Sequence, residues 1–115
     1  MTVPSMPLEI GQPSQVTGEY WLFAERKNGS YPAPTVNGGK WLIFIHRCEI
    51  DAWWATIKTA TEQGSFGRSA KVSTAKPKPN VSGPSEHVIC VYTYDCNDFD
   101  DVRRIRQALR DLGVA

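Results

Sequence analysis

Residues 41–60 read WLIFIHRCEIDAWWATIKTA, and the change of hydrophobic period inside this stretch decides the fold. Residues 41–45 are apolar without a break, which predicts a central strand covered on both faces. From residue 50 the apolar side chains recur at helical spacing, at Ile50, Trp53, Trp54, Ile57 and Ala60. Glycine tolerates the left-handed conformation that commonly follows a helix, so Gly64 is predicted to end this one.

The flanking sequence predicts three more strands and a second helix. The aromatic-rich, continuously apolar run 20–24 predicts a strand with both faces covered. The alternating residues 69–75 predict a half-buried strand, and residues 87–94 predict a fourth strand. A last helix starts near Asp98, with Asn97 or Asp98 as N-cap, and ends at Gly113. The order β-β-α-β-β-α with short, hairpin-linked strands predicts an α+β fold: a single curved, mostly antiparallel sheet with helices on one face. The opposite face would display Lys71, Ser73 and alternate residues of the other strands.

The length and the distribution of prolines predict one folded domain. A chain of 115 residues supports one hydrophobic core. Residues 1–18 contain three prolines and show no apolar period, so they are predicted to form a flexible arm. The domain is predicted to span residues 19–115.

Composition narrows the class of protein. With 13 basic and 12 acidic residues, the chain lacks the strong positive charge of a general nucleic-acid binder. Three cysteines without a C-x-x-C pair favour a reducing compartment. No apolar run reaches the ~20 residues of a membrane helix and no signal peptide is evident, so a cytoplasmic protein without membrane attachment is expected. The histidines and cysteines lack metal-ligand spacing, and no cofactor motif is present, so neither a metal nor a cofactor is predicted.

Several strings resemble those of a known group. The run 37–42 (NGGKWL), residues 67–73 (GRSAKVS) and a strand ending YTY are similar to translation initiation factor 4E, the cap-binding factor. A closer resemblance, through GKWLIF, AKVSTA and VICVYTYD, is to the basophilic-leukaemia-expressed-protein family, which shares that fold. Bacterial members of this family are sometimes labelled phosphothreonine lyase domains. The resemblance covers residues 19–114 and implies an initiation-factor-4E-like sheet.

The resemblance also carries expectations about residues. The basic loop that contacts the cap phosphates in the factor corresponds to the loop with Lys76 and Lys78. Residues 27–39 contain neither the tryptophan nor the acid that clamps a methylated guanine, so that mode of cap recognition is not expected. Relatives continue past the last helix into further sheet, which implies an exposed sheet edge in this chain.

The leading functional hypothesis rests on charge placement. Residues 63–85 contain the bases Arg68, Lys71, Lys76 and Lys78 and no acid. Clustered cations near glycines bind phosphate through charge-assisted hydrogen bonds. With Arg47 added, these residues predict recognition of a phosphorylated ligand, either nucleotide-like or a phosphopeptide. In the alternative reading the two loop lysines only solvate a proline-rich segment.

Two other functions stay open at this point. In a phosphothreonine lyase, Lys71 would be the general base and His46 the proton donor, and Arg47 with Arg68 would clamp the phosphate. In a protein-interaction domain or homo-oligomer, the exposed sheet edge would pair with another strand. RNA binding is a weaker reading, because aspartates are interleaved with the arginines of the last helix, Arg103, Arg104, Arg106 and Arg110.

Overall fold

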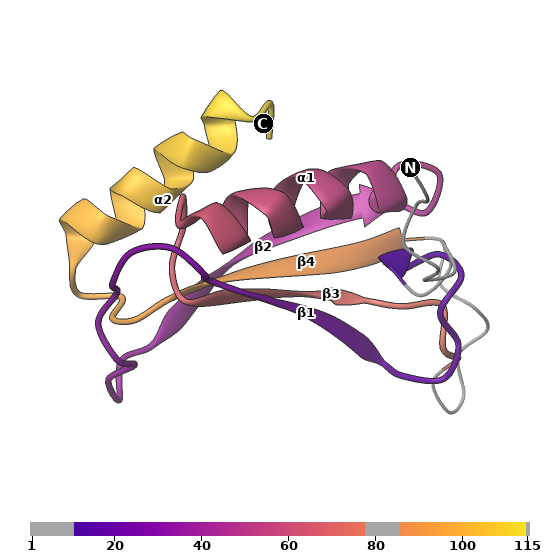
Figure 1. Cartoon of the computed structure of the whole chain (residues 1–115), viewed down its shortest axis with the longest axis horizontal. Helices are drawn as coiled ribbons and strands as arrows, with labels where there is room; N and C mark the ends of the chain where they lie inside the picture. The colour runs from indigo at the N-terminus through magenta and orange to yellow at the C-terminus, as the bar shows by residue number, and fades with distance from the viewer. Residues whose placement is uncertain (1–10, 78–85, 115) are drawn as a thin grey trace, which may run out of the picture.

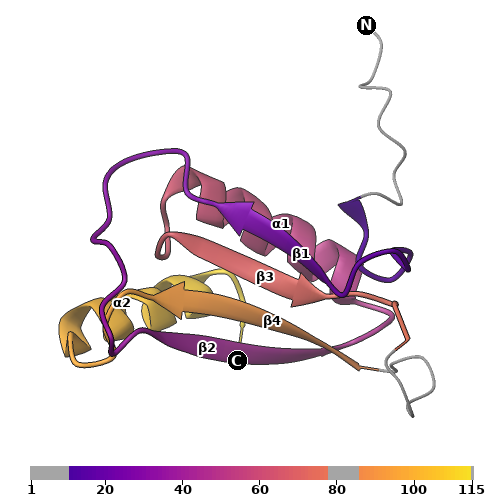
Figure 2. The ribbon, with the colours of Figure 1, turned by 90° about the horizontal axis from the view of Figure 1, so that it is seen from below.

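The computed structural model describes residues 11–77 and 86–114, and the predicted order of elements is confirmed over these residues (Figure 1). The elements are β1 (Trp21–Glu25), β2 (Gly39–His46), α1 (Ile50–Gln63), β3 (Ser69–Ser73), β4 (Glu86–Thr93) and α2 (Phe99–Asp111). They form an α+β domain in which both helices cover the same face of one sheet (Figures 1 and 2). Within the described residues, no helix or strand covers the other face, which is called the open face below. The specific likeness to initiation factor 4E stays a prediction.

The sheet is fully antiparallel, with strand order β1-β3-β4-β2. The predicted linkage of successive strands by hairpins holds for β3 and β4 only, because β1 pairs with β3 and β2 pairs with β4. The long segment between β1 and β2 therefore crosses the end of the sheet (Figure 2). This crossing places Tyr31 of the segment beside Tyr94, just after the end of β4.

The predictions that β1 and β2 are covered on both faces are wrong. Both are edge strands, and each has one apolar row that faces solvent on the open side of the sheet. Phe23 is 64% exposed, Leu42 49% and Phe44 62%. A continuous apolar run is thus compatible with an edge strand when one of its two rows lies on an uncovered face.

Capping chemistry predicts the end of α1 and the start of α2. In α1, Ile50, Trp54 and Ile57 are buried, and Gly64 follows the helix with a φ of 93°. In α2, the Asp98 carboxylate accepts a hydrogen bond from the backbone N–H of Asp101 at 3.1 Å, as an N-cap does. The described helices include none that is both long and apolar enough to span a membrane.

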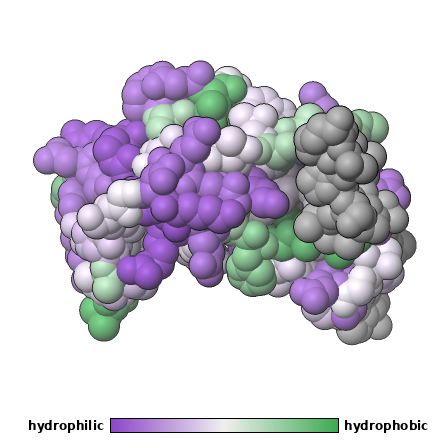
Figure 3. Space-filling view, viewed as in Figure 1, coloured by the Kyte–Doolittle hydropathy of each residue, from purple (hydrophilic) through white to green (hydrophobic). Residues whose placement is uncertain are grey.

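The core lies between the helices and the covered face of the sheet. Its fully buried members come from α1, α2, the two central strands and the turn before β3: Ile50, Trp54, Ile57, Phe66, Ala70, Val72, Ile89, Val91 and Ile105. The surface of the helical layer is mainly hydrophilic, whereas hydrophobic surface gathers over the strands β1 and β3 below it (Figure 3). Exposed large hydrophobic side chains of the sheet include Phe23, Leu42 and Phe44.

The described part of the predicted arm contacts the domain. Pro13 is fully buried, and its carbonyl accepts a hydrogen bond from the N–H of Ala75 at 3.0 Å. The N–H of Ser14 donates to the carboxylate of Asp51 in α1 at 2.9 Å. These contacts hold residues 13 and 14 against the start of α1 and the end of β3. Residues 1–10 of that arm lie outside the described residues.

Candidate functional site

The open face of the sheet displays a row of side chains that crosses all four strands. In the register, Phe23 of β1 is opposite Lys71 of β3, Lys71 is opposite Cys90 of β4, and Cys90 is opposite Leu42 of β2. Directly opposed residues in an antiparallel sheet point to the same face. The prediction that Lys71 lies on the open face is thereby confirmed.

A pocket of about 600 Å³ lies at one end of this face, where β1 and β4 end and β2 and β3 begin. The segment that crosses this end of the sheet supplies Tyr31, Pro32 and Pro34 (Figure 2). The strands and their ends supply Phe23, Gly38, Gly39, Lys40, Arg68, Ser69, Tyr92, Thr93 and Tyr94. Four aromatic rings and two cations therefore share one concavity.

Tyr31 is fixed in the wall of the pocket by its hydroxyl group. The hydroxyl donates to the carboxylate of Asp101 in α2 and accepts from the backbone N–H of Tyr94 at 3.2 Å. Its ring meets the Tyr94 ring edge to face, with 5.5 Å between centroids. Burial, followed by the hydrogen bond to Asp101, raises the pKa of Tyr31 to about 12. The tyrosine is neutral at physiological pH and acts as a structural link between the loop and α2.

Arg26 supports the same wall from behind. Its guanidinium lies 5.1 Å from the centroid of the Tyr31 ring and donates to the carbonyls of Phe66 at 2.7 Å and Gly67 at 3.1 Å. A Cβ atom on Gly67 would lie 2.3 Å from the carbonyl oxygen of Tyr92 and 3.2 Å from the Tyr31 ring. Residue 67 must be glycine for the turn before β3 to approach β4 this closely.

Tyr94 connects the pocket to the N-terminus of α2. Its hydroxyl donates to the carboxylate of Asp98, the N-cap of that helix. This hydrogen bond is the main reason that the pKa of Tyr94 is raised to about 12, and it lowers the pKa of Asp98. Tyr31 and Tyr94 are therefore both tied to carboxylates at the start of α2 through their hydroxyl groups.

The two cations of the pocket differ from the arginines that build its frame. Arg104, like Arg26, is occupied by the protein: it donates to Asp101 and to the carbonyls of Ser65 and Phe66. Lys40 and Arg68 are exposed and form no ion pair within residues 11–77 and 86–114. Their charges are available to a ligand.

Residues 32–115 match the family model described as Basophilic leukemia-expressed protein Bles03. The chain belongs to the Bles03 family. The match begins inside the loop that crosses the sheet end, so it includes most of the pocket lining but not Phe23 or Tyr31. Two aromatic residues of the pocket therefore precede the region matched to the Bles03 family, and the other two, Tyr92 and Tyr94, lie within it.

Lys71 lies on the open face beside the pocket rather than in its lining. Its ammonium is 4.0 Å from the centroid of the Trp21 ring and 5.9 Å from that of Tyr92, which does line the pocket. Cations over aromatic faces are attracted by the ring quadrupole. In the Bles03 chain this arrangement orients the Lys71 side chain along the face.

The predicted proton donor His46 and the predicted phosphate clamp, Arg47 and Arg68, lie at two different ends of the sheet. His46 pairs with Glu86 and Arg47 follows it, whereas Arg68 lies at the end where Gly39 pairs with Thr93. Seven residues of strand at ~3.3 Å each separate these ends by roughly 20 Å. Arg47 and Arg68 therefore do not clamp one phosphate. Lys71 is level with Leu42, so it lies two strands across the sheet and four residues along it from His46, and these two side chains are apart as well.

The predicted basic loop is only partly described. The ammonium of Lys76 lies 4.3 Å from the centroid of the Tyr20 ring and 3.4 Å from the carbonyl oxygen of Gly18, away from the pocket. Lys78 lies outside the described residues. Of the predicted set, Arg68 lines the pocket and Lys71 flanks it.

Sequence reasoning missed Lys40 and the aromatic residues of this Bles03 site. Tyr31 lies in a segment rich in proline and glycine, whose composition predicts a loop and no more. The available signal was Tyr31 itself, an aromatic residue between Gly29 and Pro32. Only the crossing of the loop over the sheet end shows what that ring contacts.

Proposed function

We propose that this domain binds a nucleotide-like phosphorylated small molecule in the pocket formed by Phe23, Tyr31, Tyr92 and Tyr94 with Lys40 and Arg68. One observation carries the proposal: four aromatic rings, two of them held by hydrogen bonds, line the same concavity as two cations that form no ion pair within the described residues. The volume of about 600 Å³ lies within the ~300–1,000 Å³ usual for small-molecule sites.

The two kinds of lining residue would contact different parts of such a ligand. The planar base of a nucleotide has a π-face that stacks on an aromatic side chain, and such stacking contributes about 1–3 kcal/mol. The guanidinium of Arg68 presents paired N–H donors that match two phosphate oxygens, and Lys40 adds a point charge. Hydrogen bonds of this charged type contribute about 1.5–3 kcal/mol each.

Lys71 extends the site along the open face. Its ammonium lies between Trp21 and Tyr92, and Tyr92 is shared with the pocket. A second or third phosphate leaving the pocket along the sheet would therefore approach Lys71. We expect a nucleoside triphosphate to bind more tightly than a monophosphate for this reason.

Phosphate elimination is not proposed. The predicted proton donor and phosphate clamp lie at opposite ends of the sheet, with His46 beside Glu86 and Arg68 beside the pocket, whereas the predicted base Lys71 lies in the middle of β3. A general acid must come within hydrogen-bond reach of the group that it protonates.

Isothermal titration calorimetry and thermal shift with AMP, ATP, adenosine and inorganic phosphate test the proposal. We expect AMP to bind about 10- to 100-fold more tightly than adenosine, because the nucleoside lacks the charged contacts. Arg68→Ala should weaken the binding of AMP by a similar factor. Lys76→Ala is the matched control, because Lys76 lies away from the pocket and its loss should leave binding unchanged.

Two results would contradict the proposal. One is binding of a phosphothreonine peptide without binding of any nucleotide, which would indicate a different ligand class. The other is nucleotide binding that Arg68→Ala and Lys40→Ala leave unaffected, which would place the ligand elsewhere on the protein.

A further inference from the structure

The outer edge of β2 has the properties of an interface. β2 is eight residues long and lies at the edge of the sheet, and its residues 41–45 contain no charge and no proline. β1, at the opposite edge, has five residues and runs into Glu25, Arg26 and Lys27. Long apolar edges without such charges are templates for pairing with another strand.

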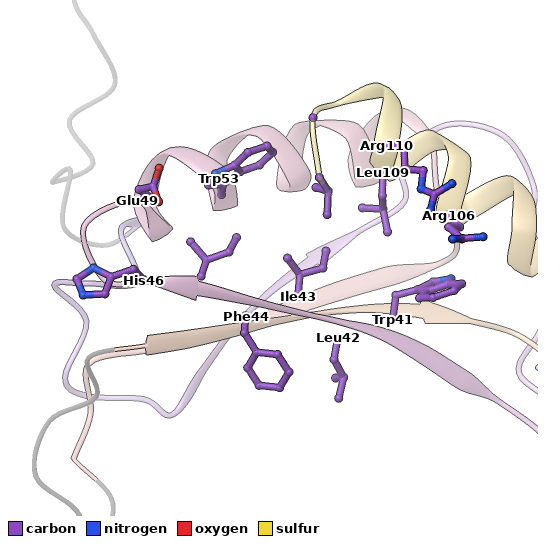
Figure 4. Close-up of a pocket in the computed structure, with 13 residues that line it drawn as sticks. Trp41, Leu42, Ile43, Phe44, His46, Glu49, Trp53, Arg106, Leu109 and Arg110 are labelled. Carbon is purple, nitrogen blue, oxygen red and sulfur yellow. The ribbon is translucent and has the colours of Figure 1, made fainter.

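An apolar groove of about 690 Å³ runs along this edge on the helical side. Trp41 and Ile43 point from β2 toward the helices, where Trp53 of α1 and Leu109 of α2 complete the lining (Figure 4). Leu42 and Phe44 point to the opposite side and are 49% and 62% exposed (Figure 4). A strand placed beside β2 would therefore find apolar partners on both of its faces.

The charges at the two ends of the groove are of opposite sign. Glu49 lies at the end near His46, whereas Arg106 and Arg110 lie at the end near Trp41 (Figure 4). Within the described part of the chain, none of these three side chains takes part in an ion pair. The groove thus carries an acid at one end and two bases at the other, all without partners of opposite charge.

A two-fold axis makes this arrangement complementary to itself. With the axis perpendicular to the sheet at Ile43, β2 of one copy runs antiparallel to β2 of the other. Trp41 then lies opposite Ile45 of the second copy, and Leu42 lies opposite Phe44. The same rotation exchanges the ends of the groove, so Glu49 of each copy faces Arg106 and Arg110 of the other. Isologous interfaces require self-complementarity of this kind.

We propose that two copies of this chain associate through β2 into a symmetric dimer with one continuous sheet across the interface. The apolar rows contribute the burial, and the two Glu49–arginine clusters select the antiparallel, two-fold arrangement over other partners of the edge. The open faces of both sheets, with their pockets, stay on the same side of the dimer.

Sedimentation velocity from low micromolar to millimolar concentration tests the proposal. The wild-type chain should form a species with twice the 12.8 kDa monomer mass. Phe44→Lys should weaken association at least ~10-fold, because it places a charge opposite Leu42 of the second copy. Phe44 is exposed in the monomer, so circular dichroism and the melting temperature should show an intact fold.

Charge reversal provides the sharper test. Glu49→Arg alone should raise the Kd of the dimer about tenfold or more, and so should the double variant Arg106→Glu/Arg110→Glu. In each variant both charge clusters become repulsive. An equal mixture of the two variants should restore the dimer as a heterodimer, in which every cluster pairs opposite charges. Arg103→Glu is the control, since that exposed arginine contacts Asp100 and does not line the groove.

Two results would overturn the proposal. A wild-type chain that is monomeric over the whole range would show that the edge does not pair with itself. A dimer that resists both charge reversals and gains nothing from mixing them would show that another surface holds it together.

Discussion

Removal of one hydroxyl group, by Tyr31→Phe, tests whether the pocket wall is held as the structure indicates. The hydroxyl donates to Asp101 of α2 and accepts from the N–H of Tyr94 at 3.2 Å. The substitution leaves the ring in place, so its contacts with Arg26 and Tyr94 persist. The measured loss of stability therefore reports the two hydrogen bonds.

The expected loss of stability depends on the hydrogen bonds that Asp101 and the N–H of Tyr94 still make in the variant. A hydrogen bond to a carboxylate contributes about 1.5–3 kcal/mol. Asp101 still accepts from Arg104 at 2.9 Å after the change, which favours the lower end of this range. The N–H of Tyr94 loses its acceptor, which adds about 1 kcal/mol. We expect Tyr31→Phe to lower the free energy of unfolding by about 2–3 kcal/mol, a large part of the ~5–15 kcal/mol of a typical domain.

Urea unfolding followed by tryptophan fluorescence measures this difference, and its pH dependence identifies the source. The pKa of Tyr31 is about 12 in the folded protein and 10.0 as the reference for an unfolded chain. A raised pKa in the folded state means that the contribution is complete below pH 10 and is lost as the pH rises toward 12. The difference between wild type and Tyr31→Phe should therefore shrink over that interval.

The control is Tyr20→Phe, because Tyr20 is 39% exposed and its ring contact with Lys76 does not need the hydroxyl. We expect that variant to change the free energy of unfolding by less than ~0.5 kcal/mol. A Tyr31→Phe effect of that small size would refute the argument that these bonds hold the wall. A large effect that is the same near neutral pH and above pH 11 would refute the assignment to the hydroxyl.

Three other substitutions test the frame of the site and the core. Gly67→Ala should destabilise the domain by about 1–3 kcal/mol in urea unfolding, since its Cβ would meet the Tyr92 carbonyl at 2.3 Å, whereas Gly18→Ala, with open space around it, should not. Ile57→Ala should cost about 2–5 kcal/mol by the same measurement, because Ile57 is fully buried between α1 and the sheet and the smaller side chain would leave a cavity. Tyr94→Phe should raise the pKa of Asp98 toward 3.8 in a carboxyl NMR titration, since the hydroxyl is the main cause of its lowering. In wild type, the contribution of this lowered pKa to stability is present above pH 3.8 and is lost as the pH falls below it; an unchanged Asp98 titration in the variant would contradict the assignment.

The sequence by itself determined the local elements of this protein. The spacing of Ile50, Trp54 and Ile57 predicts the buried face of α1, and Gly64 and Asp98 mark a helix end and a helix start. These features depend on residues within a turn or two of each other, where periodicity and capping chemistry act. The strings shared with the Bles03 family were also visible, and the family match over residues 32–115 confirms that resemblance.

Tertiary structure alone decided how these elements are combined. Trp41 to Ile45 form a continuous apolar run, yet β2 is an edge strand, because strand order depends on pairing between β1 and β3 and between β2 and β4. The same pairing separates His46 from Arg68 and brings Tyr31 beside Tyr94, 63 positions along the chain. Contacts between residues so far apart in the chain depend on the packing of the whole sheet against two helices, so the local hydrophobic period does not predict them.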